Sequence, residues 1–415
     1  MKHIVILGAG FGGLQTALTL SKQLTRHRLN GEYSVILVDK NSFHTFTPLL
    51  YEVAATSPET ASDLELQSIV TFPFEKLVGK RNIVFVQDEF VTLDPDRKVV
   101  TLSRSSIEFI YLVVALGSEV HYFDVPGLGE YALPLKTFDD AIRIRDRIVS
   151  TFRSSERNVR IVIGGGGPTG VELASEIRQW IPELEKECNR TNCGAEVTIV
   201  EGAARVLAAL DKRISAQAMQ RLHDLGISVL LNTRIIHAEE RKIYLSSEIS
   251  KEYDIFIWTG GVKANSATDQ IPFKKGGRGR IETDANTIPN DSKHDFVFAI
   301  GDNASPYHPL SHAPTPLMAR PAIIEGRVAA ENIISKITGK KKMCRYQFRN
   351  YPYIIPLGGK YAIARVGKVV LSGFPAWIFK GFTELNYFLS IMPPWTAIGV
   401  WLKGFLIFIK NDRLG

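Results

Sequence analysis

Two glycine-rich loops, each between an apolar run and a helix-like segment, constrain the fold of this chain more than any other feature. The first loop is Gly8–Gly13, with the sequence GAGFGG. The second lies within residues 164–170 and fits the same G-x-G-x-x-G spacing at Gly165, Gly167 and Gly170. In such a loop the first glycine permits a tight turn and the second lets the backbone approach a pyrophosphate. The third lets the helix pack closely on the strand. The spacing therefore predicts two nucleotide-binding units.

Short apolar runs alternate with helix-like segments along the first three quarters of the chain. This alternation is typical of βαβ units and a parallel sheet. The expected strands are 4–7, 35–38, 111–115, 160–163, 197–200, 254–258 and 296–300, and the expected helices include 13–25 and 169–180. We therefore predict an α/β fold with two Rossmann-like dinucleotide-binding domains.

An acidic residue ends the strand that follows each loop. Asp39 stands where a carboxylate accepts both hydroxyls of an adenosine ribose, and Glu201 has the same place after the second loop. A carboxylate there repels a 2′-phosphate, which favours NADH over NADPH. Arg205 is close enough in sequence to keep that preference moderate. A single glycine loop can be an accidental turn, but two complete fingerprints are far harder to obtain by chance.

Two dinucleotides in one chain indicate an electron relay. A nicotinamide delivers only hydride, whereas a flavin accepts hydride and releases electrons singly or in pairs. Asp302 ends the run Phe296–Ile300 after Gly301 and is suited to a ribityl hydroxyl. Its alternative role is that of a helix cap or turn residue. The sequence thus predicts FAD and NADH (NAD⁺) as cofactor and co-substrate.

The chain resembles the type II NADH:quinone oxidoreductases, which are FAD-dependent members of the pyridine nucleotide-disulfide oxidoreductase superfamily. The resemblance is carried by the two fingerprints, the Ala-Ile-Gly-Asp motif at 299–302 and the segment HTFTPLLY at 44–51. It continues in YIIPLGGK at 353–360 and in residues 387–391. It implies that NADH transfers a hydride to FAD and that FAD then transfers two electrons to a quinone, without proton pumping.

The resemblance also implies a division into domains and a set of site residues. The FAD-binding domain would comprise 1–120 and 265–340, the NADH-binding domain 121–264, and a C-terminal domain 341–415. Glu172 would lie beside the nicotinamide as the catalytic residue; its alternative is an exposed first-turn carboxylate favoured by the helix dipole. The expected cofactor-binding residues are Gly8, Gly10, Phe11, Gly12, Gly13, Asp39, Lys40, Ala115, Gly117, Gly301, Asp302, Gly165, Gly167, Pro168, Thr169, Gly170, Glu201 and Gly260.

The quinone side departs from the family pattern. The family often has Ala-x-x-Ala-x-Gln-Gln-Gly where this chain has residues 319–326, so both glutamines are replaced, by Ile324 and Glu325. Arg320 and Glu325 could form an ion pair in the acceptor pocket or simply solvate a helix face. The residues expected on the quinone side are Phe46, Pro48, Arg320, Ile324 and Glu325.

Two other functions stay open because of this departure. One is an NAD(P)H-dependent FAD oxidoreductase with a non-quinone acceptor. The other is a flavin-binding redox-signalling protein with little turnover.

The cysteine content excludes some flavoenzyme chemistries. Cys188, Cys193 and Cys344 cannot form a disulfide framework, which favours a reducing compartment. Disulfide reductases and sulfide:quinone reductases of this architecture need cysteines at the flavin, and nothing in the sequence places these there. Two sulfurs without further ligands also make a poor zinc site. We expect a structural or incidental role for Cys188 and Cys193, and no metal.

The net charge of +7 is concentrated at the C-terminus. Residues 340–415 carry twelve Lys or Arg and only two acids. The rest of the chain is mildly acidic, which argues against nucleic-acid binding. The positive charge instead accompanies an apolar tail.

The uncharged run 385–402 has 18 residues, the lower limit for a membrane span, but Pro393-Pro394 breaks it. Two short amphipathic helices lying in a membrane interface fit better, with basic side chains toward anionic headgroups. The alternative is an apolar helix pair that packs on the body or at a dimer interface. We predict a peripheral (monotopic) homodimer on the cytoplasmic face of the plasma membrane, bound to lipid through 375–415. The basic residues are Lys380, Lys403, Lys410 and Arg413.

Overall fold

The computed structural model describes all of the chain except residues 189–192, 308–313, 349–350 and 412–415, so Arg413 lies outside the described residues. The chain forms two compact units. The first unit consists of Met1–His44, Phe72–Glu119 and Val262–Asn350. The second unit consists of Thr45–Thr71, Val120–Gly261 and Tyr351–Gly415.

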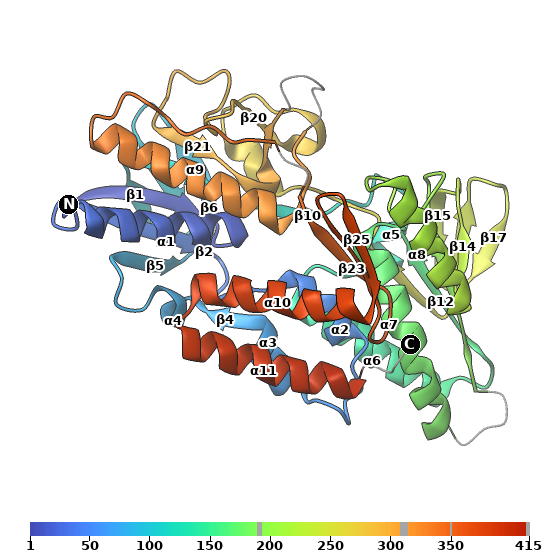
Figure 1. Ribbon diagram of the computed structural model, residues 1–415. Coiled ribbons are helices and arrows are strands. Elements are labelled where there is room, and N and C mark those ends of the chain that lie inside the picture. Colours follow the sequence, from blue (N-terminus) through green and yellow to red (C-terminus); the bar gives the residue numbers. More distant parts are fainter. Residues whose placement is uncertain (189–192, 308–313, 349–350, 412–415) are drawn as a thin grey trace. The chain divides into compact units, whose positions relative to one another are not determined.

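The first unit is built on a five-stranded sheet with the order β21-β9-β1-β2-β5. All four neighbouring pairs are parallel, with Ile4 of β1 opposite Val35 of β2 and Tyr111 of β9. Helix α9 packs against α1 (Figure 1). The bounds are β1 Lys2–Leu7, α1 Phe11–Arg26, β2 Tyr33–Asp39, β5 Ile83–Gln87, β9 Tyr111–Val114, β21 Val297–Ala299 and α9 Ala319–Ile337.

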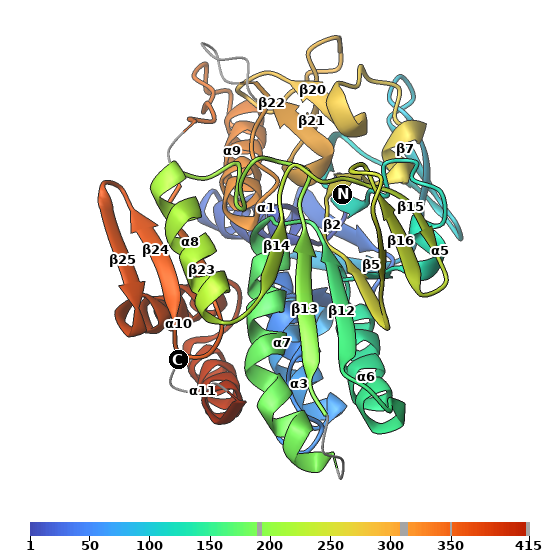
Figure 2. The same cartoon turned by 90° about the vertical axis from the view of Figure 1, so that its right-hand side faces the viewer.

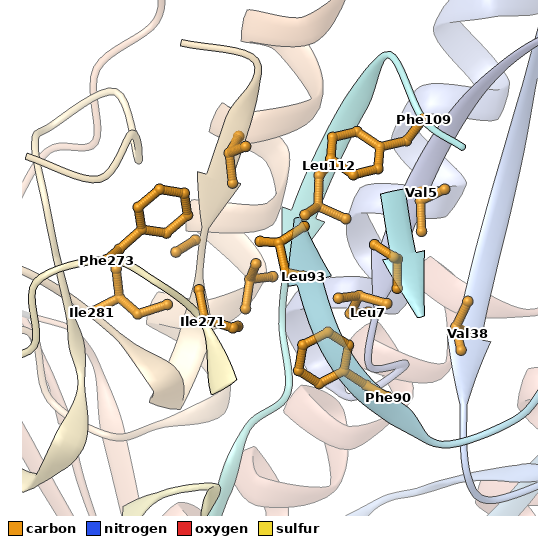
Figure 3. Packing of buried hydrophobic residues seen from close by; sticks show 14 of the residues in the cluster. Val5, Leu7, Val38, Phe90, Leu93, Phe109, Leu112, Ile271, Phe273 and Ile281 are labelled. Carbon is orange, nitrogen blue, oxygen red and sulfur yellow. The ribbon is translucent and has the colours of Figure 1, made fainter. Parts of the chain in front are cut away.

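A continuous apolar cluster covers one face of this sheet (Figure 3). Val5 and Leu7 of β1 point into it together with Leu112 of β9, and all three are buried. The opposite side of the cluster comes from the antiparallel sheet β6-β7-β8 and from the segment that contains Phe273 and Ile281. Alternate residues of β1 thus pack into this cluster, and they hold the end of the strand at which the first glycine loop begins.

The second unit contains another five-stranded parallel sheet, with the order β11-β18-β12-β13-β14. Strands β12, β13 and β14 lie side by side in Figure 2. The bounds are β11 Leu133–Pro134, α6 Phe138–Ser154, β12 Val159–Gly164, α7 Pro168–Glu187, β13 Ala195–Val200, α8 Lys212–Asp224, β14 Ser228–Leu230 and β18 Ile255–Trp258. The two βαβ units expected from the glycine loops are confirmed.

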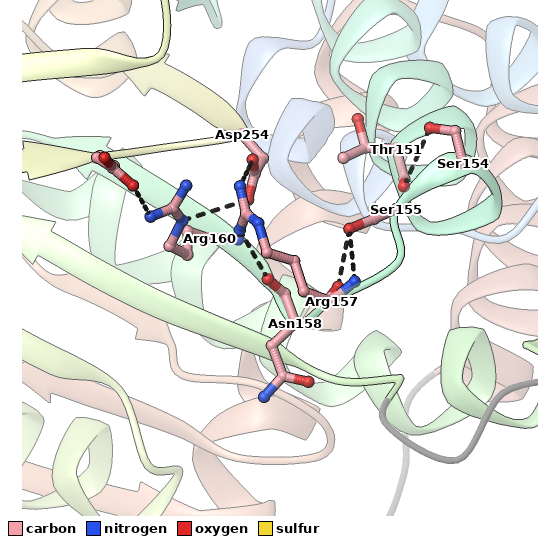
Figure 4. A network of polar contacts seen from close by, with 8 residues as sticks. Thr151, Ser154, Ser155, Arg157, Asn158, Arg160 and Asp254 are labelled. Carbon is pink, nitrogen blue, oxygen red and sulfur yellow. Dashed lines mark hydrogen bonds and ion pairs between the residues drawn. The ribbon is translucent and has the colours of Figure 1, made fainter.

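A polar network fixes the beginning of β12 (Figure 4). The carboxylate of Asp254 accepts from both terminal nitrogens of Arg157, at 2.7 and 2.9 Å, and from the backbone N–H of Arg160 at 2.8 Å. The Arg160 side chain in turn bonds Glu252. Because Asp254 directly precedes β18, this bidentate pair aligns β12 with its neighbouring strand.

The C-terminal part of the second unit is an antiparallel sheet followed by two helices. Helix α10 packs against α11 and β24, and α11 packs against α3. Pro393 separates α10 from α11, as predicted, and no helix in the described part of the chain is long and apolar enough to cross a bilayer. The bounds are η1 Thr47–Leu49, α2 Leu50–Ala54, α3 Asp63–Val70, β23 Tyr353–Pro356, β24 Ala362–Val366, β25 Val369–Gly373, α10 Phe374–Ile391 and α11 Pro394–Asn411.

Smaller elements complete the described chain. They are β3 Phe43–Thr45, β4 Thr71–Pro73, α4 Phe74–Val78, β6 Phe90–Asp94, β7 Val99–Leu102, β8 Ser106–Glu108, β10 Ser118–Val120, α5 Leu128–Tyr131, β15 Ile235–Glu239, β16 Lys242–Leu245, β17 Ser250–Glu252, β19 Val262–Ala264, η2 Ser266–Gln270, η3 Gly277–Gly279, β20 Ile281–Thr283, η4 Gly301–Asn303 and β22 Ala304–Pro306.

The contact between α1 and α9 depends on small residues. A Cβ on Gly326 of α9 would lie 2.5 Å from the carbonyl oxygen of Gly12. The hydroxyl of Thr16 lies 2.8 Å from that oxygen and 3.1 Å from the carbonyl oxygen of Gly326. The two helix backbones therefore approach each other directly beside the first glycine loop.

We predict that Gly326→Ala lowers the free energy of unfolding by about 1–3 kcal/mol, because the new methyl group overlaps a backbone oxygen that cannot move away easily. Alanine normally stabilises a helix interior relative to glycine by up to about 1 kcal/mol. Gly399→Ala, in α11 with none of the described neighbouring atoms within 4 Å of the new Cβ, is the matched control and should stabilise. Thermal unfolding followed by circular dichroism measures both. Equal shifts of the two variants would contradict the proposed close approach.

Candidate functional site

The two glycine loops have the same backbone conformation at their first glycine. Gly8 has φ +95° and Gly165 has φ +108°, values that L side chains rarely adopt. A Cβ on Gly8 would lie 2.2 Å from the carbonyl oxygen of Ala115, and one on Gly165 would lie 2.6 Å from Cα of Gly260. In both units the loop therefore turns tightly against the end of the neighbouring strand.

The other two glycines of each loop also correspond. A Cβ on Gly13 or on Gly170 would lie 1.9 Å from the carbonyl oxygen of the first glycine in its own loop. At Gly10 and Gly167 no described atom beyond the adjacent residues lies within 4 Å of the Cβ position. The third glycine is thus required for packing, whereas the second faces open space through which a ligand can approach the backbone.

Each loop leads directly into the N-terminus of a helix. Helix α1 is capped by Gly10 and α7 by Gly167, and neither cap makes a side-chain hydrogen bond. The N–H groups of the first turn can therefore donate hydrogen bonds to a ligand, and the helix dipole adds positive potential. Neither first turn carries an acid. Both sites fit the pyrophosphate of a dinucleotide.

The predicted ribose-binding acids also occupy equivalent positions. Asp39 accepts from the N–H of Ala9 at 2.7 Å, and Glu201 accepts from the N–H of Gly166 at 2.5 Å. Each acid is thus fixed against the second residue of its own glycine loop. Burial raises the pKa of Asp39, and the bond from Ala9 opposes this. At the ends of β2 and β13, both carboxylates stand where the ribose of a bound dinucleotide would reach them.

The basic residues next to these acids are used in different ways. The guanidinium of Arg205 donates to the carbonyl oxygens of Leu210 and Ala208, at 2.9 and 2.5 Å. Two backbone carbonyls close in sequence thus engage its guanidinium. Lys40 is exposed, with its Nζ 3.9 Å from a carboxylate oxygen of Glu89.

In the first unit, hydrogen bonds connect the turns after β9 and β21. The hydroxyl of Ser118 donates to Asp302 at 2.6 Å, and the N–H of Gly117 donates to the Asn303 side chain at 3.0 Å. Gly301 has φ +71°, and its N–H donates to the Glu325 carboxyl at 2.7 Å. Asp302 is thus held by its neighbours at the end of the sheet where it was expected.

His44 is a site residue that the sequence analysis did not single out. It is buried, and its Nδ1 lies 3.2 Å from the carbonyl oxygen of Ala9 in the first loop. The ring of Phe11 packs edge-on against it at 5.0 Å between centroids. Burial lowers the pKa of His44 to about 4, so the ring is uncharged at neutral pH and braces the loop. Its only sequence signal was its place at the start of the segment HTFTPLLY.

A buried cluster of charged side chains lies in the second unit. The ammonium group of Lys380, in α10, bonds the carboxylate of Glu52 in α2 and lies 2.9 Å from Glu384 one helical turn later. The hydroxyl of Tyr51 donates to Glu52 at 2.6 Å. The other oxygen of Glu52 is buried and has no hydrogen-bond partner among the described residues. The expectation that Lys380 faces lipid headgroups is wrong, because its ammonium group bonds Glu52 and Glu384.

The acids of this cluster outnumber its single base. Burial raises the pKa of Glu172, in α7, well above its ordinary value; Lys380 opposes the shift and Glu52 adds to it. Burial also raises the pKa of Glu384 against the opposing charge of Lys380. For Lys380 burial lowers the pKa, but the two carboxylates outweigh it and keep the pKa above the ordinary value. Lys380 is therefore charged, and Glu172 keeps its proton to a higher pH than an ordinary glutamate.

The residues expected on the quinone side fall into two groups. Phe46 is buried in the second unit and stacks on Tyr387 at 5.1 Å between ring centroids, whereas Pro48 is exposed. In the first unit Arg320 is exposed and Glu325 is buried. No ion pair joins these two described residues, so they do not form the expected pair in a pocket. They do not share a solvated helix face either, because Glu325 is buried. Ile324 between them is half-buried.

A cavity of about 130 Å³ lies within the second unit between α10 and α11. Its lining is mostly apolar and includes Ile69, Trp401 and Phe405. Lys380 and Glu384 also contribute to its wall. The charged cluster thus borders an apolar space.

Comparison with known proteins agrees with these two dinucleotide-binding units. The family described as Pyridine nucleotide-disulphide oxidoreductase matches residues 2–326, which is most of the chain. The chain belongs to this family.

Relatives within this family are similar along most of their length. The chain is 27% identical over 350 residues to a type II NADH:quinone oxidoreductase of Staphylococcus saprophyticus, covering 82% of this chain and 83% of that protein. It is 28% identical over 389 residues to the protein of the same name from Staphylococcus aureus strain NCTC 8325, covering 91% and 93%. The resemblance stated from the sequence is confirmed.

Solved structures share the fold. The structure of NDH2 from Plasmodium falciparum in complex with NADH has a TM-score of 0.84 at 18% identity, covering 99% of this chain and 98% of that one. The sulfide:quinone oxidoreductase of Aquifex aeolicus has a TM-score of 0.76 at 17% identity, covering 96% and 92%. The predicted α/β fold with Rossmann-like domains is confirmed.

A disulfide lies at the C-terminal end of α7. Cys188, at the end of α7, is bonded to Cys193, with 6.2 Å between their Cα atoms. This bond was not expected from the sequence. Helix α7 has 20 residues, so the disulfide lies about 30 Å along the helix axis from the glycine loop at its other end. Its position supports a structural role.

We predict that Lys380→Met lowers the free energy of unfolding by about 3–5 kcal/mol, because Glu52 and Glu384 would stay buried without a cation. Lys403→Met is the control: this exposed lysine of α11 bonds the Ser68 hydroxyl, and its loss should change stability by less than about 0.5 kcal/mol. Adding Glu52→Gln and Glu384→Gln to Lys380→Met should restore most of the loss. Urea unfolding measures all three. A triple variant as unstable as the single one would show that charge is not the cause.

Proposed function

We propose that this protein is a type II NADH:quinone oxidoreductase that does not pump protons. The observation that carries the proposal is the pair of glycine loops with matching geometry, each followed by a carboxylate fixed to its own loop. FAD would be held by the loop of the first unit and NADH by that of the second. The named relatives support this assignment because they are similar along most of the chain.

The first unit supplies a rigid cradle for FAD. The open backbone at Gly10 and the N-terminus of α1 would receive the pyrophosphate, Asp39 the adenosine ribose and Asp302 the ribityl chain. When bound, FAD accepts hydride from NADH and returns two electrons to the acceptor. The other predicted cofactor-binding residues, Lys40 included, and the division into FAD, NADH and C-terminal domains belong to the same proposal.

The second unit orients NADH and supplies protons. The backbone at Gly167 would receive the pyrophosphate and Glu201 the ribose, while catalysis rests mainly on positioning the nicotinamide. Reduction of a quinone by two electrons consumes two protons. Burial raises the pKa of Glu172 well above its ordinary value, and its charged neighbours are Lys380 and Glu52, which bond each other. Glu172, which the resemblance places beside the nicotinamide, is assigned the role of proton-holding residue.

A flavoenzyme with a non-quinone acceptor is the second candidate. It was motivated by the loss of two glutamines, but Glu325 binds Gly301 and is buried, so its substitution does not by itself change an acceptor pocket. Ile324 and the exposed Arg320 remain the residues in its favour. A redox-signalling protein would differ from both enzymes by negligible steady-state oxidation of NADH.

An anaerobic stopped-flow experiment tests the proposed reaction. We expect NADH to bleach the flavin absorbance, and a short-chain quinone mixed in afterwards to restore it faster than the turnover rate. Fast bleaching without reoxidation would reject quinone as the acceptor and leave the flavin dehydrogenase. Absence of bleaching would reject the enzyme altogether. Glu172→Gln, mixed in the same way, separates proton supply from hydride transfer because it should slow the second phase more than the first.

The tail helices support binding at a membrane surface. Helix α11 exposes Trp395, Ile398, Leu402 and Leu406, which recur every three or four residues and so share one face. Trp395 is 85% exposed, the largest value among the exposed large apolar residues of the described chain. Lys403 and Lys410 add positive charge for anionic lipid. We propose a monotopic protein on the cytoplasmic face of the plasma membrane, as a homodimer whose two anchors act together.

We predict that Trp395→Ser with Leu406→Ser weakens partitioning to anionic vesicles at least tenfold, since burying one such side chain is worth about 1.5–3 kcal/mol. The control is Ile236→Ser with Ile249→Ser, which removes two exposed apolar residues from the β15–β17 region. Cosedimentation with phosphatidylglycerol-containing vesicles measures both. Equal partitioning of the two double variants would reject the α11 surface as the anchor.

A further inference from the structure

Glu325 occupies a structural position in the first unit that the proposed reaction does not explain. It lies in α9, directly before Gly326, the residue that contacts Gly12 of the first glycine loop. One of its carboxyl oxygens, Oε2, accepts from the N–H of Gly301 at 2.7 Å. Glu325 thus ties the helix that packs on the glycine loop to the turn that carries Asp302.

The groups around the Glu325 carboxyl satisfy only part of its hydrogen-bonding capacity. Its second oxygen, Oε1, is buried and has no hydrogen-bond partner among the described residues. The charged groups facing it from the elements packed around α9 are Arg280 and Asp302, while α1 presents Gly12 and Thr16. Arg280 is itself engaged by the carbonyl oxygens of Ala304 and Thr315, at 2.7 and 3.0 Å.

Burial raises the pKa of Glu325 to about 8, with Asp302 adding to the shift. The Gly301 N–H and the charge of Arg280 act in the opposite direction but do not cancel it. An ionised Glu325 would put a second negative charge beside Asp302 and near a loop built for a pyrophosphate. The uncharged carboxyl avoids this cost and still accepts the hydrogen bond from Gly301.

We propose that Glu325 is a positioning residue for FAD that works only while it carries a proton. Uncharged, it holds Gly301 and thereby Asp302 in place beside the glycine loop without adding negative charge; ionised, it keeps the bond from Gly301 but repels the diphosphate. This inference rests on the proposed binding of FAD in the first unit and does not depend on the acceptor.

The proposal gives the departure from the family pattern a physical meaning. A protonated glutamate has nearly the shape of glutamine and, like it, offers an uncharged oxygen to the Gly301 N–H. Below its pKa this chain therefore reproduces the pattern that the glutamine provides. Above its pKa it does not, so the substitution adds a dependence on pH that a glutamine lacks.

The test measures FAD binding to the apoprotein as a function of pH, with FAD itself as the probe. If only the protonated form positions FAD, the apparent Kd rises with the fraction ionised, about tenfold between pH 7 and pH 9. We expect this rise in the wild-type protein. Glu325→Gln should bind FAD at pH 7 as the wild type does and stay flat to pH 9. Glu325→Ala, which loses the Gly301 bond, should bind weakly throughout.

Glu331→Gln is the matched control. This exposed glutamate of the same helix bonds the Cys344 sulfur, and its variant should keep the wild-type pH profile. A flat profile in the wild-type protein, or an unchanged rise in Glu325→Gln, would overturn the proposal. Quinone reduction is not part of the readout. Failure of the quinone reaction with an intact FAD profile would therefore reject the proposed acceptor alone.

Discussion

The close approach of backbone to backbone around the glycine loops is the constraint on which the rest of this structure depends. At Gly13 and Gly170 a side chain would overlap the loop's own first carbonyl, and at Gly326 it would overlap the loop from the adjoining helix. Removing Cβ at these points brings the helix N-terminus directly over the strand end. The N–H groups and the dipole then converge on one point without any charged side chain. The anion site is therefore made by backbone, and the side chains around it serve to hold that backbone still.

Carboxyl groups in this chain are stabilised in three electrically different ways. Asp39 and Glu201 accept N–H groups of their own loops and remain near the strand end, where solvent and ribose can reach them. Glu52 is compensated by the ammonium group of Lys380. Glu325 accepts a backbone N–H, and the arginine that faces it already donates to two carbonyl oxygens, so burial raises its pKa. The same side-chain type thus accepts backbone N–H groups beside a glycine loop, pairs with an ammonium group, or is buried with a raised pKa, depending on what surrounds it.

Local features of the sequence were sufficient for the two glycine loops and their strands. The glycine spacing, the apolar runs and the acid at the end of the next strand are all set within about forty residues, and β1, α1, β2, β12, α7 and β13 lie where they were expected. The charged cluster could not be found in this way. Glu52 and Lys380 are 328 positions apart, and a lysine in an apolar tail fits a lipid headgroup as well as a buried acid. The one available signal was Glu384, four residues after Lys380 and one of only two acids in that tail.

Glu325 shows the same limit from the opposite direction. The family pattern located Glu325 in the sequence. The replacement of its glutamine, with Arg320 nearby, suggested a change in the acceptor pocket. Sequence spacing does not say which side of α9 faces the sheet, and Arg320 and Glu325 differ by five residues, which places them on different faces of a helix with 3.6 residues per turn. The helix face toward α1 and Gly301 takes Glu325 and leaves Arg320 in solvent. A substitution that looks like a change of substrate is, in its physical setting, a change in how the chain holds the turn at Gly301. Function inferred from a motif therefore has to be reassigned residue by residue once the buried face of the helix is known.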